Sequence, residues 1–128
     1  LEDVLDAPFG ASGPCMHEAL FSDRGFGEGL STIDVAKALI DEGFHPMTMY
    51  FPLVVHGAML VEPTETESKA NLDQFIMALC SIAERAKAGD QSLKAAPIHA
   101  PRRRLDETLA ARKPVLVYKD PEPAQAAE

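Results

Sequence analysis

The clearest hydrophobic pattern begins at residue 64, after which apolar side chains recur at helical spacing. Thr64 and Glu67 have the spacing of a capping box, in which a hydroxyl and a carboxylate each satisfy a free backbone N–H of the first turn. Gly89 suits a left-handed helix end, with Arg85 and Lys87 in the last turns. These signals predict one long amphipathic helix. Its apolar stripe consists of Leu72, Phe75, Ile76, Leu79, Ile82, Ala83 and Ala86.

A shorter helix is predicted earlier in the chain. Ser31 or Thr32 suits the N-cap, and Asp34 favours the positive end of the helix dipole. Gly43 is placed to end this helix in a left-handed conformation. The apolar face of the helix consists of Ile33, Ala36, Leu39 and Ile40.

Three other segments are rich in strand-forming residues. Residues 15–22 are a short mixed run that favours a strand. Residues 53–63 are an apolar run with Gly57 in its middle. This run predicts either one long bulged strand or a turn followed by a strand over residues 58–62. A weaker strand is predicted at residues 115–118.

The order of these elements predicts the fold class. Strands and helices alternate as β-α-β-α, followed by one helical turn at residues 105–111 and the weaker third strand. Pro46 and Pro52 exclude a regular helix between the first helix and the second strand. We therefore expect an α/β (α+β) domain, with a small sheet and helices packed on one of its faces.

Charge is distributed unevenly along the chain. The 128 residues carry a formal net charge of −8, which argues against a partner made of nucleic acid. Residues 94–119 hold seven basic and two acidic residues, whereas residues 1–93 hold five basic and fifteen acidic ones. A basic segment therefore follows an acidic body. The apolar content of 46% suffices for a core, but no apolar run is long enough to predict a membrane span.

The cysteines and the first residues bear on the origin of the chain. Cys15 and Cys80 lie far apart in apolar surroundings, which is typical of reduced thiols in a cytosolic protein. We therefore expect a cytoplasmic location. The chain starts without a methionine or a signal-peptide pattern, which suggests a piece cut or processed from a longer protein.

The residues that could hold a metal or a phosphate do not form a recognisable motif. The four histidines and two cysteines lack zinc-motif spacing, so no metal site is expected. The loop GFGEGLST resembles a phosphate cradle before a helix, but it lacks the lysine of a P-loop. Glu28 in this loop would repel a phosphate, so a flexible turn is favoured.

No nucleophile with its partners is recognisable either. Ser31, Ser68 and Cys80 all fall in predicted helices or caps, without the surrounding sequence of a catalytic elbow. We therefore predict no catalytic residue within the chain. Arg102, Arg103 and Arg104 could bind a carboxylate or a phosphate, or could be solvated or paired with the acidic body, and both alternatives stay open.

Five sequence blocks together resemble one family. They are CMHEALFS, STIDVAKALIDEGFHPMTMYFPLVVHGAMLVEPTETES, LDQFIMAL, AAPIHAP and RRLDETLAARKPVL. This combination closely resembles the C-terminal region of the glycine cleavage system P-protein, the pyridoxal-phosphate-dependent glycine dehydrogenase (decarboxylating). It is most similar to the subunit 2 type, which occurs where the P-protein is split into two chains. The resemblance covers residues 15–118.

The resemblance implies a fold, a reaction and a set of partners. It implies the small C-terminal domain of an aspartate aminotransferase-like, type I pyridoxal-phosphate enzyme. In that enzyme glycine loses its carboxylate as CO₂ and passes an aminomethyl group to the lipoyl arm of the H-protein, with the cofactor as electron sink. The implied partners are a large pyridoxal-phosphate domain, P-protein subunit 1 and the lipoylated H-protein. No residue here fits the cofactor lysine, so we expect no cofactor bound to this piece and no activity from it alone.

The resemblance also suggests boundaries and candidate site residues. Residues 1–14 would be a linker from the missing large domain, residues 15–119 the small domain, and residues 120–128 a disordered tail. The candidates for the active-site channel or the domain interface are Glu62, Glu65, His99, Arg103 and Arg104.

Two of these candidates are basic and form a testable pair. Arg103 and Arg104 would give the entrance for the lipoyl arm a basic rim that steers an acidic carrier protein. Two other classes of protein stay open as alternatives. One is a stand-alone ligand-binding or regulatory α/β module, and the other is a structural domain that completes a dimer. An isolated small domain would expose the face for its large domain, so the piece itself could dimerise.

Overall fold

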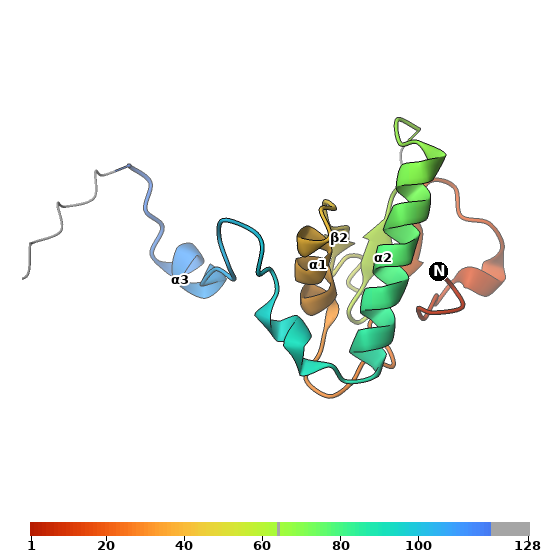
Figure 1. Ribbon diagram of the computed structural model, residues 1–128, viewed down its shortest axis with the longest axis horizontal. Coiled ribbons are helices and arrows are strands. Elements are labelled where there is room, and N and C mark those ends of the chain that lie inside the picture. The colour runs from red at the N-terminus through yellow and green to blue at the C-terminus, as the bar shows by residue number, and fades with distance from the viewer. Residues whose placement is uncertain (64, 119–128) are drawn as a thin grey trace, which may run out of the picture.

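The computed structural model describes residues 1–63 and 65–118. Its elements, shown in Figure 1, are β1 (Ala19–Phe21), α1 (Thr32–Asp41), β2 (Thr48–Met49), β3 (Met59–Val61), α2 (Lys69–Lys87) and α3 (Glu107–Arg112). Short 3-10 turns occur at Gly10–Ser12 and Gln91–Ala95. No helix in the described ranges is both long enough and apolar enough to cross a membrane.

The three strands form one antiparallel sheet in the order β1-β3-β2. Side chains alternate along a strand, so Phe21, Met59 and Val61 reach the core while Leu60 lies on the opposite, half-buried face. Figure 1 shows α1 and α2 side by side in front of this sheet. The predicted small α/β architecture is therefore confirmed, and the sheet is antiparallel.

The core lies between the sheet and the two long helices. Leu79 and Ile82 of α2 meet Val35 and Leu39 of α1, and all four side chains are at most 1% exposed. Leu5, which falls in the segment predicted as a linker, is also buried in this core. The larger apolar core residues are Leu5, Phe21, Leu30, Val35, Leu39, Met59, Val61, Leu79, Ile82 and Leu93.

Helix α1 begins and ends as its sequence predicts. Ser31 is the N-cap, and the carboxylate of Asp34 accepts a hydrogen bond from the Ser31 backbone N–H at 2.9 Å. At the other end Gly43 has a φ of 84°. Its N–H donates to the Ile40 carbonyl and the next N–H, of Phe44, donates to the Leu39 carbonyl, which is the Schellman pattern.

Helix α2 begins later than predicted. Its N-cap is Ser68, whose hydroxyl accepts a hydrogen bond from the Asn71 N–H at 3.1 Å. The predicted capping box is therefore wrong, because Glu67 instead accepts a hydrogen bond from the Asn71 side-chain amide at 3.1 Å. Thr64, the other half of that predicted box, lies outside the described residues. The predicted end of the helix is confirmed, since Gly89 has a φ of 76° just after the C-cap.

Two of the predicted strands are present in shorter form, and one is absent from the described residues. Strand β1 is only the last part of the predicted segment 15–22, and β3 supports the second alternative for residues 53–63, a turn before a strand. Strand β2 was not predicted, because it has two residues between Pro46 and Pro52. The predicted strand at residues 115–118 is wrong for this chain, since these residues are exposed and outside the sheet.

The glycine-rich loop before α1 is packed against α2. Gly27 donates its N–H to the Ala86 carbonyl at 2.8 Å. A Cβ on Gly27 would lie 2.4 Å from the Gly89 Cα, so only glycine permits this approach. The loop is therefore a packed turn whose glycine serves the fold.

Candidate functional site

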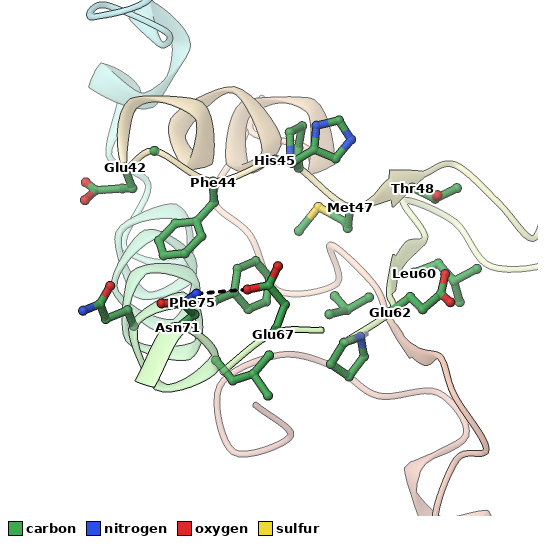
Figure 2. A pocket seen from close by; sticks show the side chains of 16 residues that line it. Glu42, Phe44, His45, Met47, Thr48, Leu60, Glu62, Glu67, Asn71 and Phe75 are labelled. Atoms are coloured by element: carbon green, nitrogen blue, oxygen red, sulfur yellow. Dashed lines mark hydrogen bonds between the residues drawn. The ribbon is translucent and has the colours of Figure 1, made fainter. Parts of the chain in front are cut away.

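An open groove lies where the end of α1, the edge of the sheet and the start of α2 meet. Its volume is about 690 Å³, which is within the range of small-molecule and peptide sites. Figure 2 shows its walls, with Phe44 and Phe75 on one side and Leu60 with Glu62 on the other. The apolar side chains that line it include Phe44, Met47, Leu60, Leu72 and Phe75.

Local sequence features shape the groove. The left-handed turn at Gly43 directs Phe44 back toward α2, where its ring packs edge-on against Phe75 with the centroids 5.5 Å apart. Pro63 follows β3 and marks the start of the turn that leads to α2. The groove therefore depends on how α1 and β3 end, and both endings are visible in the sequence.

The polar side chains of the groove include three carboxylates and one imidazole, that of His45. Glu42, Glu62 and Glu67 contribute carboxylates, whereas no lysine or arginine is among the described residues that line it. Figure 2 shows Glu67 projecting into the groove, where Asn71 donates a hydrogen bond to it. Such a site favours a ligand or segment that is apolar and carries positive charge.

The sequence-based candidates Glu62 and Glu65 separate in the structure. Glu62 lines the groove at the end of β3, and its side chain is exposed. Glu65 lies in the exposed turn between β3 and α2 and is not among the groove residues. Glu67, which the sequence analysis assigned only to a cap, contributes to the groove.

Arg104 fastens the C-terminal segment to the start of α1. Its Nε donates to the Ala96 carbonyl at 2.8 Å and one terminal nitrogen donates to the Leu93 carbonyl at 3.1 Å. The guanidinium also lies 2.8 Å from Asp34 Oδ1. The Asp34 side chain is 4% exposed and that of Arg104 is 34% exposed. The charge of Arg104 is therefore already balanced by a buried carboxylate.

Asp41 fastens the same segment to the end of α1. Its carboxylate accepts hydrogen bonds from the backbone N–H groups of Ile98 and His99, each at 2.8 Å. Desolvation raises the pKa of Asp41, but the hydrogen bonds from His99 and Ile98 lower it, and the net shift is downward. His99 is thus held by its backbone while its side chain is exposed.

The two attachments define a clamped loop, residues 98–104. Asp41 holds its start and Asp34 holds its end through Arg104. Between these points Arg102 and Arg103 are exposed. The structure therefore places His99, Arg103 and Arg104 on this one loop, which is attached to α1 through His99 and Arg104. None of the three is among the residues that line the groove.

Metal ligation has no candidate in the described part of the chain. Over residues 1–63 and 65–118, no group of three or more histidine, cysteine, aspartate or glutamate side chains could hold an ion. The fold and the groove together define a small α/β domain with an open groove among its described residues.

Comparison with known proteins gives the family. A family model described as "Glycine dehydrogenase, C-terminal domain" matches residues 5–101. A curated relative from Caulobacter vibrioides, "Probable glycine dehydrogenase (decarboxylating) subunit 2", is 67% identical over 121 residues. That alignment covers 93% of this chain and 23% of the relative. Relatives with the same name from Shouchella clausii and Caldanaerobacter subterraneus are 48% and 53% identical, covering 93% and 80% of this chain and 24% and 21% of their own lengths.

The chain belongs to the family of glycine dehydrogenase C-terminal domains. It spans about a quarter of the length of the curated relatives that it matches. The resemblance seen in the sequence is therefore confirmed.

Proposed function

We propose that the chain is the C-terminal domain of a pyridoxal-phosphate-dependent glycine dehydrogenase (decarboxylating) of the glycine cleavage system. The observation that carries this proposal is the family match over residues 5–101, together with 67% identity to a subunit 2 protein. The domain acts with the rest of its polypeptide, an aminotransferase-like large domain, and with subunit 1. The complete enzyme removes CO₂ from glycine and delivers the aminomethyl group to the lipoylated H-protein.

The described residues do not fit pyridoxal phosphate by themselves. The cofactor requires a lysine amine and donors for its phosphate, but the groove is lined by carboxylates and no lysine. Lys69, at the start of α2, is exposed and paired with Asp73. We therefore place the cofactor-holding residues in the rest of the enzyme, and we expect this chain alone to be inactive.

The edge around Glu62 is the part of the domain that we assign to the contact with the large domain. Glu62 is exposed beside the groove and Glu65 lies in the adjoining turn. Exposed carboxylates at a domain edge supply polar contacts across it.

The cysteines suit a reducing bacterial cytoplasm, because Cys15 is exposed and Cys80 is partly buried, and both are free.

The clamped loop is the part that we assign to the carrier protein. Arg102 and Arg103 are exposed on a segment fixed at both ends, so binding there needs little further ordering of the backbone. They would steer an acidic carrier. Arg104 supports the loop instead of contacting the carrier, because its guanidinium is engaged with Asp34.

The test of the proposed function compares the complete enzyme with this chain. The complete subunit with subunit 1, pyridoxal phosphate and H-protein should exchange the glycine carboxylate with bicarbonate. The 128-residue chain, given the cofactor, should show no lysine adduct after borohydride reduction and mass analysis. A stoichiometric adduct at one lysine would contradict the assignment of the cofactor site to the missing part.

Two substitutions in the complete enzyme test the assigned surfaces. Glu62→Gln should lower kcat/KM by roughly 3–10-fold, the effect of weakening one hydrogen bond of about 1 kcal/mol. Glu84→Gln, an exposed change on α2, is its control. Arg103→Gln should raise the KM for H-protein at low salt and flatten its salt dependence, while Arg103→Lys should preserve both. Unchanged kinetics with H-protein at low salt would remove the assigned role of the loop.

A further inference from the structure

The last described segment, residues 114–118, has the sequence of a strand but no strand to pair with. Its apolar side chains are almost fully exposed: Val115 by 85%, Leu116 by 87%, Val117 by 69% and Tyr118 by 81%. Residues of this kind favour a sheet, and such a row of exposed apolar groups is typical of an interaction site. Arg112 and Lys113 come directly before it, so the arm, defined as residues 112–118, is apolar and basic.

The groove is complementary to this arm in charge and in polarity. Its lining combines apolar side chains with the carboxylates of Glu42, Glu62 and Glu67. The described lining residues include one histidine, His45, and no lysine or arginine. Thr48 of β2 also lines the groove, and β2 is an edge strand that pairs only with β3 within the sheet. An extended segment can add to an exposed edge of this kind through backbone hydrogen bonds, while adjacent pockets receive its side chains.

The arm and the groove of one chain are at opposite ends of α1. The chain before the arm is fastened to the first turn of α1 by Arg104 and Asp34, whereas the groove begins at Glu42, just past the last turn. A helix of ten residues separates these ends by about 15 Å. Figure 1 shows α3 leading the chain away from the packed body. The arm of a chain is therefore directed away from its own groove.

We propose that two copies of this chain exchange their arms, each arm lying in the groove of the other copy. Residues 114–118 extend along β2, and Arg112 and Lys113 meet the carboxylates of Glu42 and Glu67. The contact is self-complementary, so two equal contacts close a symmetric dimer. The proposal is argued from the arm and the groove and does not rest on the proposed function. Glu62 also lines this groove, so the exchange is proposed for the 128-residue chain, without the large domain assigned above to the Glu62 edge.

The proposal can be tested by reversing the charges of the arm in one variant and those of the groove in another, and then mixing the two variants. One variant carries Arg112→Glu with Lys113→Glu, and the other carries Glu42→Lys with Glu67→Lys. Sedimentation velocity of the 128-residue chain, from micromolar to near-millimolar concentration, should show a dimer for the wild type. Each variant alone should dimerise at least about tenfold more weakly, because like charges then face each other. An equal mixture should recover the dimer, since both contacts become attractive again.

Two controls separate this contact from loss of structure and from net charge. Asp3→Lys with Glu84→Lys changes the charge equally at exposed positions outside the groove and should leave the dimer intact. Truncation after Lys113 should abolish the dimer while the circular dichroism of the body stays unchanged, because no described residue after Pro97 is buried. A wild-type chain that stays monomeric, a truncated chain that still dimerises, or a mixture that fails to recover the dimer would each overturn the proposal. If the wild-type chain is monomeric, the groove does not bind the arm of a second copy.

Discussion

The packed body, residues 1–97, and the C-terminal segment, residues 98–118, are held in place by different forces. The body encloses a core of apolar side chains from the sheet, α1 and α2. The segment buries none of its own residues and is attached through Asp41 and Arg104. The family match covers residues 5–101, nearly the same range as the body.

Apolar burial and polar attachment therefore have different consequences for the two parts of the chain. Apolar burial acts without direction and stabilises the whole body, whereas the polar attachments fix one loop in one position. The apolar residues beyond α3 have no place in the body's core and remain exposed. Their exposure is the observation from which the exchange of arms was proposed.

The largest effect should come from the body's core. Leu79→Ala should lower the free energy of unfolding by about 2–5 kcal/mol, because Leu79 is fully buried and the change leaves a cavity. Leu116→Ala is the matched control in the segment, and its effect on the monomer should stay within about 0.5 kcal/mol. Urea unfolding at low protein concentration measures both. Equal decreases in the free energy of unfolding would contradict the view that only the body is stabilised by apolar burial.

A smaller effect should come from the attachment at Arg104. Arg104→Ala leaves the buried carboxylate of Asp34 without its cation and should cost about 1–3 kcal/mol, between the values for exposed and buried pairs. Arg103→Ala removes an exposed charge and should cost less than about 0.5 kcal/mol. Urea unfolding of both variants measures the difference. If Arg103→Ala were the more costly change, the clamp as described would be incorrect.

The N-cap of α2 should contribute less. Ser68→Ala removes the hydroxyl that accepts from the Asn71 N–H and should cost about 0.5–2 kcal/mol. Ser81→Ala, an exposed change within the same helix, should be neutral or slightly stabilising, because alanine has the higher helix propensity. Thermal unfolding followed by circular dichroism separates the two. A neutral Ser68→Ala would mean that another residue caps the helix.

The smallest effect should be a local response to acid. The folded-state pKa of Asp41 is lowered from its ordinary value of 3.8, so its contribution to stability is present above that value and is lost as the pH falls below it. The amides of Ile98 and His99 should then lose protection from hydrogen exchange while the core amides of α2 stay protected. Asp41→Ala should show the same loss at neutral pH. Protected Ile98 and His99 amides in Asp41→Ala would contradict the attachment.

The sequence predicted those parts of the fold that local chemistry determines. The cap at Ser31, the left-handed ends at Gly43 and Gly89, and the core face of α2 around Leu79 all follow from short-range rules. The family was likewise predictable, because its motifs are long. The C-terminal strand was wrong because strand propensity at Val115 needs a neighbouring strand, which the pattern cannot supply.

The site was predictable only in part, because it depends on contacts between distant residues. Glu62 was found through its place at the end of an apolar strand, and it does line the groove. Glu67 was assigned to a cap that the structure replaces with Ser68. Pairing of Arg104 with the acidic body was one of the two alternatives left open, and the structure supports it. The partner itself could not be predicted, since Asp34 is seventy positions earlier and carries its own capping signal.

The pairing of Arg104 with Asp34 has a practical consequence for anyone who shortens this protein. A gene fragment that stops at residue 101, where the family match ends, would keep every apolar residue of the core. It would nevertheless lack Arg104, which pairs with the buried Asp34 carboxylate. The carbonyls of Leu93 and Ala96 would also lose the hydrogen bonds that Arg104 donates to them. Expression of fragments should therefore improve sharply once the last codon retained encodes Arg104, three residues past the apparent end of the domain.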